Sequence, residues 1–335
     1  MERKIKKEEI GKFLRRLSEK YEVIIPTEFN DSFEFRVINR NKNEIADGIE
    51  KFSNSKIPPK KFLIPESEIA FEFSEIDGNA IIKEINIDKR ERIIFGIRPC
   101  DVNAILLLDI VKKEKPKDLS YFKRRERTLL FSLECNTLCK NSFCTSLGTG
   151  PFIESGADLR FTDIGDYYLV KALTDNGEKF LNFPEFENAD KKDKILRDKM
   201  VKNIDTKIIG HEEISEKLEE IDEEYWDSIA TRCIECYICT LLCPTCYCFN
   251  VFDTLSVFGN SGHRIIFQDS CMSRDFSRLA GGENPRRERR ERLRNRIYHK
   301  LKYFVDRYGR LGCTGCGRCV SLCPVGIDIR EFIFE

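Results

Sequence analysis

Two twelve-residue runs of cysteines constrain this 335-residue chain more than any other feature. Both follow the pattern C-x2-C-x2-C-x3-C-P, at residues 233–244 and 313–324. Three cysteines at steps of three wrap a loop around one cubane cluster, and the fourth points toward a neighbouring cluster. The repeat therefore predicts two 4Fe-4S clusters that exchange their fourth ligands. The expected ligands are Cys233, Cys236, Cys239 and Cys323 for cluster one, and Cys313, Cys316, Cys319 and Cys243 for cluster two.

Zinc and disulfides fit this pattern less well. Structural zinc usually takes two separated cysteine pairs, whereas here three cysteines share one loop. Disulfide frameworks belong to small secreted domains, and this longer chain opens Met1-Glu2-Arg3-Lys4 without a signal peptide. In a chain expected to be cytoplasmic, 15 cysteines indicate that thiols bind metal or take part in redox reactions. The interpretation is a ferredoxin-type electron relay.

The overall composition does not favour nucleic acid or membrane as a partner. Lys+Arg and Asp+Glu number 57 each, so the formal net charge is zero. The most apolar stretch, residues 93–111, is interrupted by Arg98, Asp101 and Asp109 and cannot span a bilayer unaided. We expect a protein without membrane segments.

The N-terminal part, residues 1–184, is predicted to be an α/β (α+β) domain with a mostly parallel or mixed sheet. Residues 93–97 and 128–133 are continuous apolar runs typical of buried strands, and residues 102–111 between them have a helical pattern. Strand, helix and strand at this spacing predict a βαβ unit with parallel strands. Further elements are expected as a helix at 8–21, strands at 33–37, 69–73, 80–85, 159–161 and 167–170, and a loop at 58–61.

Four more cysteines follow the two strands of this βαβ unit. They are Cys100, Cys135, Cys139 and Cys144. Because the carboxyl ends of parallel strands meet at one rim of a sheet, these thiols could hold a third 4Fe-4S cluster. Two alternatives stay open: Cys100 is a small buried core residue, or it is a nucleophile that needs one of the three histidines, His211, His263 or His299, as its base.

Residues 185–231 are rich in charge and are predicted to form a helical connector, and residues 232–335 a mostly α-helical two-cluster ferredoxin-like domain. Between the cysteine runs, residues 245–312 are expected to be helical or irregular. Trp226 is expected to pack the connector onto the first cysteine loop, and the acidic run 219–224 is either a docking patch or a solvated helix face. Cys246, Cys248 and Cys271 receive no assignment.

The segment 285–310 is strongly basic and allows three interpretations. It binds nucleic acid, it is a solvated face, or it offsets the negative charge of thiolate-ligated clusters and docks an acidic partner. The third needs no further assumption. The alternative class of protein is a zinc-stabilised nucleic-acid-binding protein that uses this basic helix.

No nucleotide or flavin site is recognisable in the sequence. The chain contains neither a G-x-G-x-x-G after a strand nor a Walker loop, and it offers no paired acid and base. We therefore expect no flavin or NAD(P) on this chain and no catalytic residues. A self-contained reductase remains a second alternative to a relay between other subunits.

Several short motifs outside the cysteine runs resemble one known family. The chain is similar to the iron-sulfur β subunits of cytosolic NiFe sulfhydrogenases and to the related iron-sulfur subunits of anaerobic sulfite reductases. The motifs are IPPKKF at 57–62, CD at 100–101, GTGP at 148–151, CPTCYC at 243–248, DSC at 269–271, AGG at 280–282 with Asn284, and HK at 299–300.

This resemblance implies an electron-transfer subunit of an oxidoreductase. Its partners would be an FAD- and NAD(P)-binding reductase subunit and a catalytic module, either NiFe hydrogenase or sirohaem sulfite reductase. The segment around Pro58 and the phrase GADL at 156–159 are closer to the sulfhydrogenase branch. Relatives carry a cysteine two residues before the position of Cys144, where this chain has Ser142, and Cys139 lies three residues earlier. The resemblance therefore leaves the fourth ligand of the third cluster open.

Overall fold

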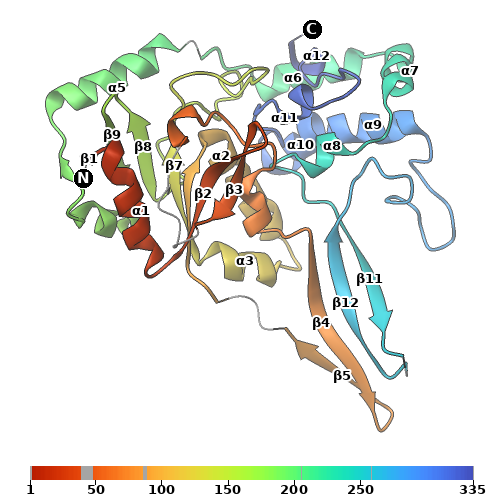
Figure 1. Ribbon diagram of the computed structural model, residues 1–335. Coiled ribbons are helices and arrows are strands. Elements are labelled where there is room, and N and C mark those ends of the chain that lie inside the picture. The colour runs from red at the N-terminus through yellow and green to blue at the C-terminus, as the bar shows by residue number, and fades with distance from the viewer. Residues whose placement is uncertain (1, 39–47, 86–88, 205, 258, 335) are drawn as a thin grey trace.

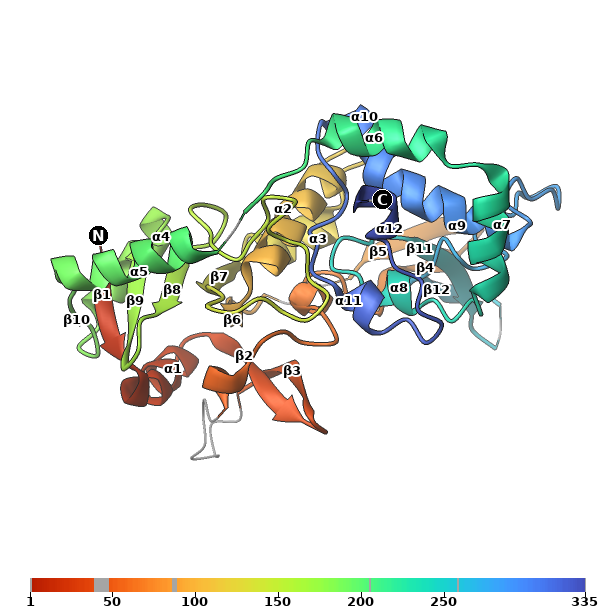
Figure 2. The ribbon, with the colours of Figure 1, turned by 90° about the horizontal axis from the view of Figure 1, so that it is seen from above.

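A computed structural model of the chain describes residues 2–38, 48–85, 89–204, 206–257 and 259–334. A sheet covered by helices forms one side of the molecule, and a helical, cysteine-rich part forms the other (Figures 1 and 2). A narrow arm of four strands extends away from both.

The central sheet has eight strands in the order β10-β1-β9-β8-β7-β6-β2-β3. Strands β2, β6, β7 and β8 run parallel, and the outer strands pair antiparallel, so the expected mixed sheet is confirmed. The strands are β1 Glu2–Lys6, β2 Glu22–Phe29, β3 Ser32–Val37, β6 Arg92–Ile97, β7 Thr128–Leu133, β8 Leu159–Asp163, β9 Tyr167–Ala172 and β10 Glu187–Asn188.

Helices cover both faces of this sheet because its central strands are apolar on both sides. From β6, Phe95 points into a core with Phe13 of α1 (Ile10–Ser18), whereas Ile94 points into an opposite core. That second core contains Leu108 of α2 (Pro99–Lys112) and Tyr121 of α3 (Leu119–Arg125). Each fully buried apolar side chain of this size contributes about 1.5–3 kcal/mol relative to an exposed one. The shorter helical turns are η1 Lys7–Glu9, η2 Ile49–Lys51, η3 Pro59–Phe62, α4 Asp175–Glu178 and η4 Lys179–Asn182.

Two local predictions need correction. Helix α2 begins at Pro99 and not at residue 102, since proline is favourable in a first helical turn, and Cys100 therefore lies within that turn. The expected loop at 58–61 is mostly a 3₁₀ turn, η3, which buries Lys60. Strand formation at 93–97 and 128–133, and their parallel pairing, are confirmed.

Residues 185–231 are mainly helical, although their first part contributes β10 to the large sheet, and side chains cap two of the helices. Asp190 accepts hydrogen bonds from the backbone of Lys192 and Asp193 at the start of α5 (Lys191–Asn203), and Asp222 accepts one from Tyr225 at the start of α7 (Glu223–Arg232). Trp226 is buried in one core with Cys233 and Cys239, and it stacks on Phe332. The remaining helices are α6 His211–Glu220, α8 Ile238–Leu241, α9 Arg289–Tyr298, the π-helix η5 His299–Tyr303, α10 Phe304–Tyr308, α11 Arg318–Ser321 and α12 Glu331–Phe334.

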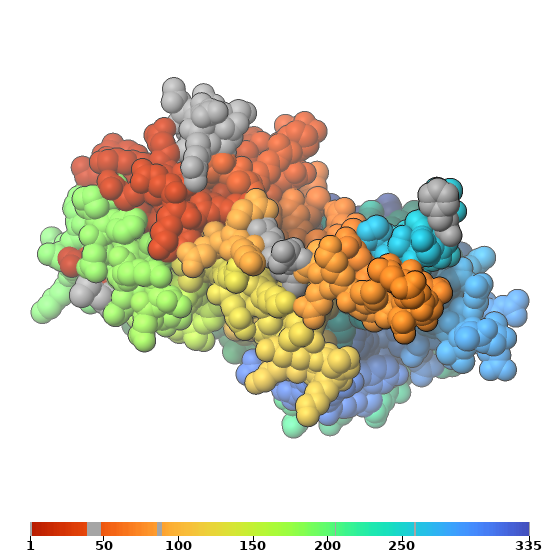
Figure 3. Space-filling view, turned by 90° about the horizontal axis from the view of Figure 1, so that it is seen from below, coloured from red at the N-terminus to blue at the C-terminus, as the bar shows by residue number. Residues whose placement is uncertain are grey.

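The prediction for residues 245–312 was wrong in part, because a β-hairpin occupies 249–268. Its strands are β11 (Phe249–Leu255) and β12 (Ser261–Gln268), and β12 pairs with β4 (Ser67–Ile76), which pairs with β5 (Asn79–Glu84). This second sheet is the arm, and its two hairpins lie side by side in Figures 1 and 3. The arm contains β4 and β5, which the predicted domain boundaries place in the N-terminal domain, and β11 and β12, which they place in the C-terminal domain. That division stays a prediction.

Within the described ranges, no helix combines the length and the apolar character needed to cross a bilayer.

Candidate iron-sulfur centres

The four cysteines predicted for cluster one line a single cavity. Cys233, Cys236 and Cys239 come from the first run, and Cys323 reaches the same cavity from the second. The other lining residues are mostly apolar: Ile234, Ile238, Met272, Leu293, Ile297, Val325, Ile327 and Ile329. Cys319, predicted for cluster two, lines this cavity as well, so the cavity brings Cys323 to the first run but the assignment of ligands stays a prediction.

The four cysteines predicted for cluster two are likewise neighbours. Cys243, from the first run, interacts electrostatically with Cys313, Cys316 and Cys319 of the second. Burial raises the pKa of Cys316 to about 12, and the nearby Arg318 opposes this rise. Four such thiols facing one another in a buried site match the donor set of a cluster.

The two cysteine loops follow the same backbone path. Their third residues, Glu235 and Gly315, have φ angles of 55° and 59°, and their fifth residues, Tyr237 and Gly317, have 62° and 76°. Glycine adopts this left-handed conformation freely, whereas Glu and Tyr do so at a cost. An ion pair with the buried guanidinium of Arg292 helps to hold Glu235 in place.

The cluster-two loop lies directly against the loop that carries Cys139 and Cys144. The backbone N–H of Phe143 donates to the carbonyl of Gly315 at 2.8 Å. A Cβ atom on Gly315 would lie 2.6 Å from the backbone nitrogen of Cys144, which is closer than packed atoms can approach. The loops can therefore meet backbone to backbone only with glycine at this position.

Replacing Gly315 with alanine is expected to lower the free energy of unfolding by about 1–3 kcal/mol through overpacking. Chemical denaturation under anaerobic conditions measures the change. Gly309→Ala is the matched control, because Gly309 has a similar φ of 64° but a Cβ added there would meet no atom within 4 Å. Equal losses in the two variants would mean that backbone strain, and not the close approach of the loops, sets the requirement for glycine.

The structure brings the four remaining predicted cysteines together at the carboxyl ends of β6 and β7. The thiol of Cys135 interacts with those of Cys139 and Cys144, and Cys100 interacts with Cys135. Cys100 also interacts with Cys316 of cluster two. Ser142 lies in the same loop, where its hydroxyl donates to the carbonyl of Cys139 at 2.7 Å. This group of thiols therefore lies beside the cysteines predicted for cluster two.

These observations bear on the two alternatives for Cys100. Burial raises the pKa of Cys100 well above its usual value, and the groups that act most strongly on it are Asp101, Cys316, Arg318 and Cys135, with no histidine among them. A protonated thiol without a base is a poor nucleophile. The nucleophile interpretation therefore lacks the partner that it requires.

A buried ion pair ties this group of thiols to the cluster-two loop. Arg318 donates to both carboxylate oxygens of Asp101, at 2.7 and 2.8 Å, and to the carbonyl of Ser55 at 2.8 Å. Asp101 follows Cys100 in α2, and Arg318 precedes Cys319. A bidentate pair of this kind fixes orientation as well as distance.

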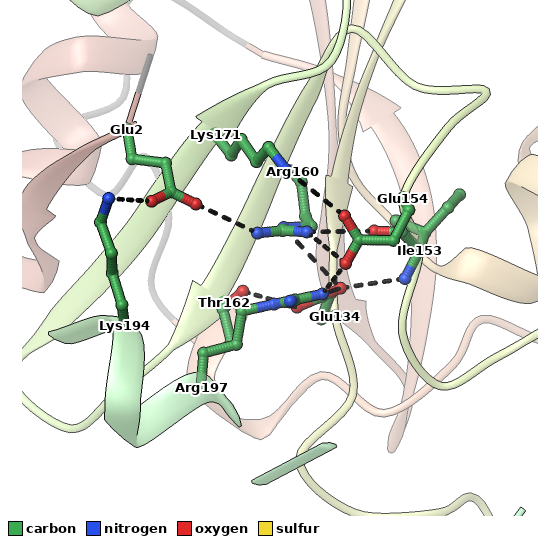
Figure 4. A network of polar contacts seen from close by, with 9 residues as sticks. All are labelled: Glu2, Glu134, Ile153, Glu154, Arg160, Thr162, Lys171, Lys194 and Arg197. Atoms are coloured by element: carbon green, nitrogen blue, oxygen red, sulfur yellow. Dashed lines mark hydrogen bonds and ion pairs between the residues drawn. The ribbon is translucent and has the colours of Figure 1, made fainter. Parts of the chain in front are cut away.

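A second buried network holds the start of the Cys135 loop (Figure 4). Glu134 accepts hydrogen bonds from Arg197 of α5 at 2.9 and 3.0 Å, from Thr162 at 2.6 Å and from the backbone of Ile153 at 2.9 Å. Arg160 extends the network through Glu154, at 2.7 Å. The network joins the connector helix to the sheet at the residue before Cys135.

Three basic residues of the segment 285–310 are buried near the cysteines at intervals of four: Arg292, Arg296 and Lys300. Arg296 donates to the carbonyl of Cys239 at 2.6 Å and interacts with both Cys239 and Cys319. Its charge therefore lies between the two predicted clusters. This placement supports the interpretation that the segment offsets cluster charge.

Other basic residues of the same segment pair with the connector. Arg294 binds Glu223 at 2.5 Å, and Lys302 binds Glu219 at 2.6 Å. Both carboxylates belong to the acidic run 219–224. The acidic and basic runs are thus engaged with each other within the chain.

Sequence reasoning did not single out Lys60 as a site residue. Its side chain is 4% exposed, and its amine donates to the carbonyl of Cys246 at 2.7 Å. The amine also interacts with the thiols of Cys243, Cys246 and Cys248. The motif IPPKKF contains this lysine, but nothing local to the motif indicates a partner 186 residues away.

Among the described residues, no three His, Cys, Asp or Glu side chains converge closely enough to hold one metal ion. Four thiolates on a single zinc would all lie within about 2.3 Å of it, whereas a cubane spreads its ligands over four irons. The preference for clusters over zinc therefore rests on the sequence pattern, in which three cysteines share one loop in each run.

The fold and the paired thiol loops define an iron-sulfur protein, and residues 232–327 match the 4Fe-4S dicluster domain family. Over 346 aligned positions the chain is 30% identical to sulfhydrogenase 2 subunit beta of Pyrococcus furiosus, covering 99% of this chain and 97% of that protein. The chain belongs to the family of sulfhydrogenase β subunits. No solved structure matches it.

Proposed function

We propose that this chain relays electrons within a hydrogenase-type complex through two 4Fe-4S clusters with exchanged fourth ligands. Cluster one would be held by Cys233, Cys236, Cys239 and Cys323, and cluster two by Cys313, Cys316, Cys319 and Cys243. The observation that carries this proposal is a cavity lined by Cys233, Cys236 and Cys239 of one run together with Cys323, and also Cys319, of the other. A bound cluster supplies reversible one-electron transfer.

The residues of the chain would set how readily the electrons move. The mostly apolar residues around the cluster-one cavity would lower the local polarity, which affects the reduction potential. Arg296 and Lys300 place positive charge beside the thiolates, which favours the reduced, more negative state of a cluster. The protein makes and breaks no bonds in this role.

Cys100, Cys135, Cys139 and Cys144 are proposed as ligands of a third 4Fe-4S cluster. Their position beside Cys316 would make this cluster the neighbour of cluster two in the relay. Electrons would then have a route from the helical part of the protein to the rim of the large sheet.

Cys139→Ser tests the third cluster, and it is expected to lower the iron content by up to about four atoms per chain, from about twelve. Iron and acid-labile sulfide are measured on anaerobically purified protein. Ser142→Ala, in the same loop, is the control and should leave both contents unchanged. Unchanged iron in Cys139→Ser would remove Cys139 from the ligand set.

The proposed partners are an FAD- and NAD(P)-binding reductase subunit and a catalytic NiFe hydrogenase module, with sirohaem sulfite reductase as the second choice. The relative's name, sulfhydrogenase 2 subunit beta, supports the first branch. The isolated chain should hold no flavin and should be reduced by NAD(P)H only after a reductase subunit is added. NAD(P)H oxidation by the isolated chain would instead indicate a self-contained reductase.

Anaerobic purification tests the proposal as a whole. Brown protein containing iron and inorganic sulfide is expected. Colourless protein that contains zinc and binds nucleic acid would overturn the relay and favour the zinc-stabilised alternative.

A further inference from the structure

Three thiols close to cluster two lie outside every proposed ligand set: Cys246, Cys248 and Cys271. We propose that Cys248 and Cys271 form a redox-active dithiol that exchanges two electrons with the clusters and reacts with small disulfides. This inference rests on the proposed function, because the clusters are the electron donors. The argument depends on the contact between the two thiols, on their different exposure and on the charges around them.

The arm holds the two thiols together. Cys248 immediately precedes β11 and Cys271 follows β12, and the ladder between these strands begins with the pair Phe249 and Gln268. The backbone N–H of Asp269 donates to the carbonyl of Cys248 at 3.0 Å, which continues the pairing past the end of the strands. The thiols of Cys248 and Cys271 are the groups that act most strongly on each other.

A third thiol connects this pair to the relay. Cys246 interacts with both Cys248 and Cys271, and it shares a side-chain hydrogen bond with Cys243, the proposed fourth ligand of cluster two. The dithiol therefore lies close to a cluster. Contact through Cys246 and Cys243 gives a short path for electrons.

The two thiols differ in their access to solvent. Cys271 is 6% exposed, whereas Cys248 is partly exposed and lines a groove between the arm and the large sheet. Other residues that line the groove are Leu63, Tyr121, Tyr247, Phe249 and Phe267. This difference suits a pair in which Cys248 meets the substrate and Cys271 resolves the intermediate.

The contact with Cys271 lowers the pKa of Cys248 and so favours its thiolate, the reactive form in disulfide exchange, whereas the contact with Cys248 and burial raise the pKa of Cys271. Lys60 and Lys300 are both buried, and each interacts with the thiols of Cys243 and Cys246. Both lysines also act on Cys248. Buried ammonium groups are costly unless negative charge lies near them, and thiolates would supply it.

The reaction balances in two stages. The Cys248 thiolate attacks one sulfur of a small disulfide, breaking its S–S bond and releasing one thiolate, and the Cys271 thiolate then attacks the Cys248 sulfur and releases the second thiolate. The chain now carries a Cys248–Cys271 disulfide, which is oxidised by two electrons. Two bound clusters, each reduced by one electron, would supply the two electrons that, together with two protons from solvent, restore both thiols.

The test is a reductive titration of the full-length chain with its clusters in place. The protein is first treated anaerobically with glutathione disulfide, and dithionite is then added while cluster bleaching is followed. Wild-type protein is expected to consume two electrons beyond those taken by the clusters. Cys248→Ser, Cys271→Ser and the double variant should each consume two fewer, and peptide mapping of the oxidised wild type should identify the Cys248–Cys271 bond.

Ser273→Ala is the matched control, since it changes a small side chain two residues after Cys271 without removing a thiol, and it should retain the two extra electrons. Equal electron uptake by wild type and Cys248→Ser would overturn the proposal. Loss of iron or zinc in Cys248→Ser or Cys271→Ser would also overturn it, because these residues would then be metal ligands. Failure of the relay itself would be recognised separately, by the absence of iron and of bleaching.

Discussion

Cys323→Ser is expected to remove cluster one, although the other three ligands of that cluster lie in the run at 233–244. Cluster two, whose first three ligands lie in the same run as Cys323, should remain bound. Total iron should fall by about four atoms per chain. The reason is that Cys323 lines the cavity of Cys233, Cys236 and Cys239. Iron analysis and electron paramagnetic resonance of the reduced protein measure the loss.

Double variants identify which cluster has been lost. Cys323→Ser combined with Cys236→Ser should cost no more iron than either change alone, whereas Cys323→Ser with Cys316→Ser should cost about eight atoms. Ser321→Ala is the control within the same run. If instead Cys323→Ser and Cys316→Ser removed the same four irons, each run would form its own cluster and the exchange of ligands would be refuted.

Breaking the buried pair of Arg318 and Asp101 is expected to be the most destabilising single change outside the cysteines. Arg318→Leu leaves the Asp101 carboxylate buried without its bidentate partner, which typically costs about 3–5 kcal/mol. The free energy of unfolding is measured anaerobically in denaturant. The same variant should loosen the contact between cluster two and the proposed third cluster.

Two further variants test whether the loss of stability in Arg318→Leu comes from the buried ion pair. Arg278→Leu, which breaks an exposed pair with Asp275, should change stability by less than about 1 kcal/mol. Combining Arg318→Leu with Asp101→Leu should cost less than the sum of the two single changes, because no unpaired charge remains. Strict additivity would show that the two residues act independently.

The sequence predicted those parts of the structure that depend on local spacing. The interval between cysteines predicted that Cys323 would join Cys233, Cys236 and Cys239, and the geometry places them in one cavity. The apolar runs at 93–97 and 128–133 predicted adjacent parallel strands because a strand buried on both faces has a continuous apolar signature. Whether these thiols bind clusters stays a prediction.

The parts that were missed depend on partners distant in sequence. Strand β11 is largely exposed and β12 is mostly half-buried, so neither has the alternation of buried and exposed residues that marks a strand against a core. Their stability comes from pairing with β4, about 190 residues earlier, and no local pattern reports such pairing. The contact of Lys60 with Cys246 could not be predicted either, because the two residues lie 186 positions apart in the sequence.

The pairing of β12 with β4 has a consequence for the integrity of the dicluster region. In a fragment that began at residue 232, β12 would lose its neighbour and present a bare row of backbone donors and acceptors to other molecules, which invites aggregation. The region that carries the cysteine loops is therefore not expected to be stable as an isolated fragment. It pairs with β4, a strand that the ribosome makes before any cysteine of the two runs.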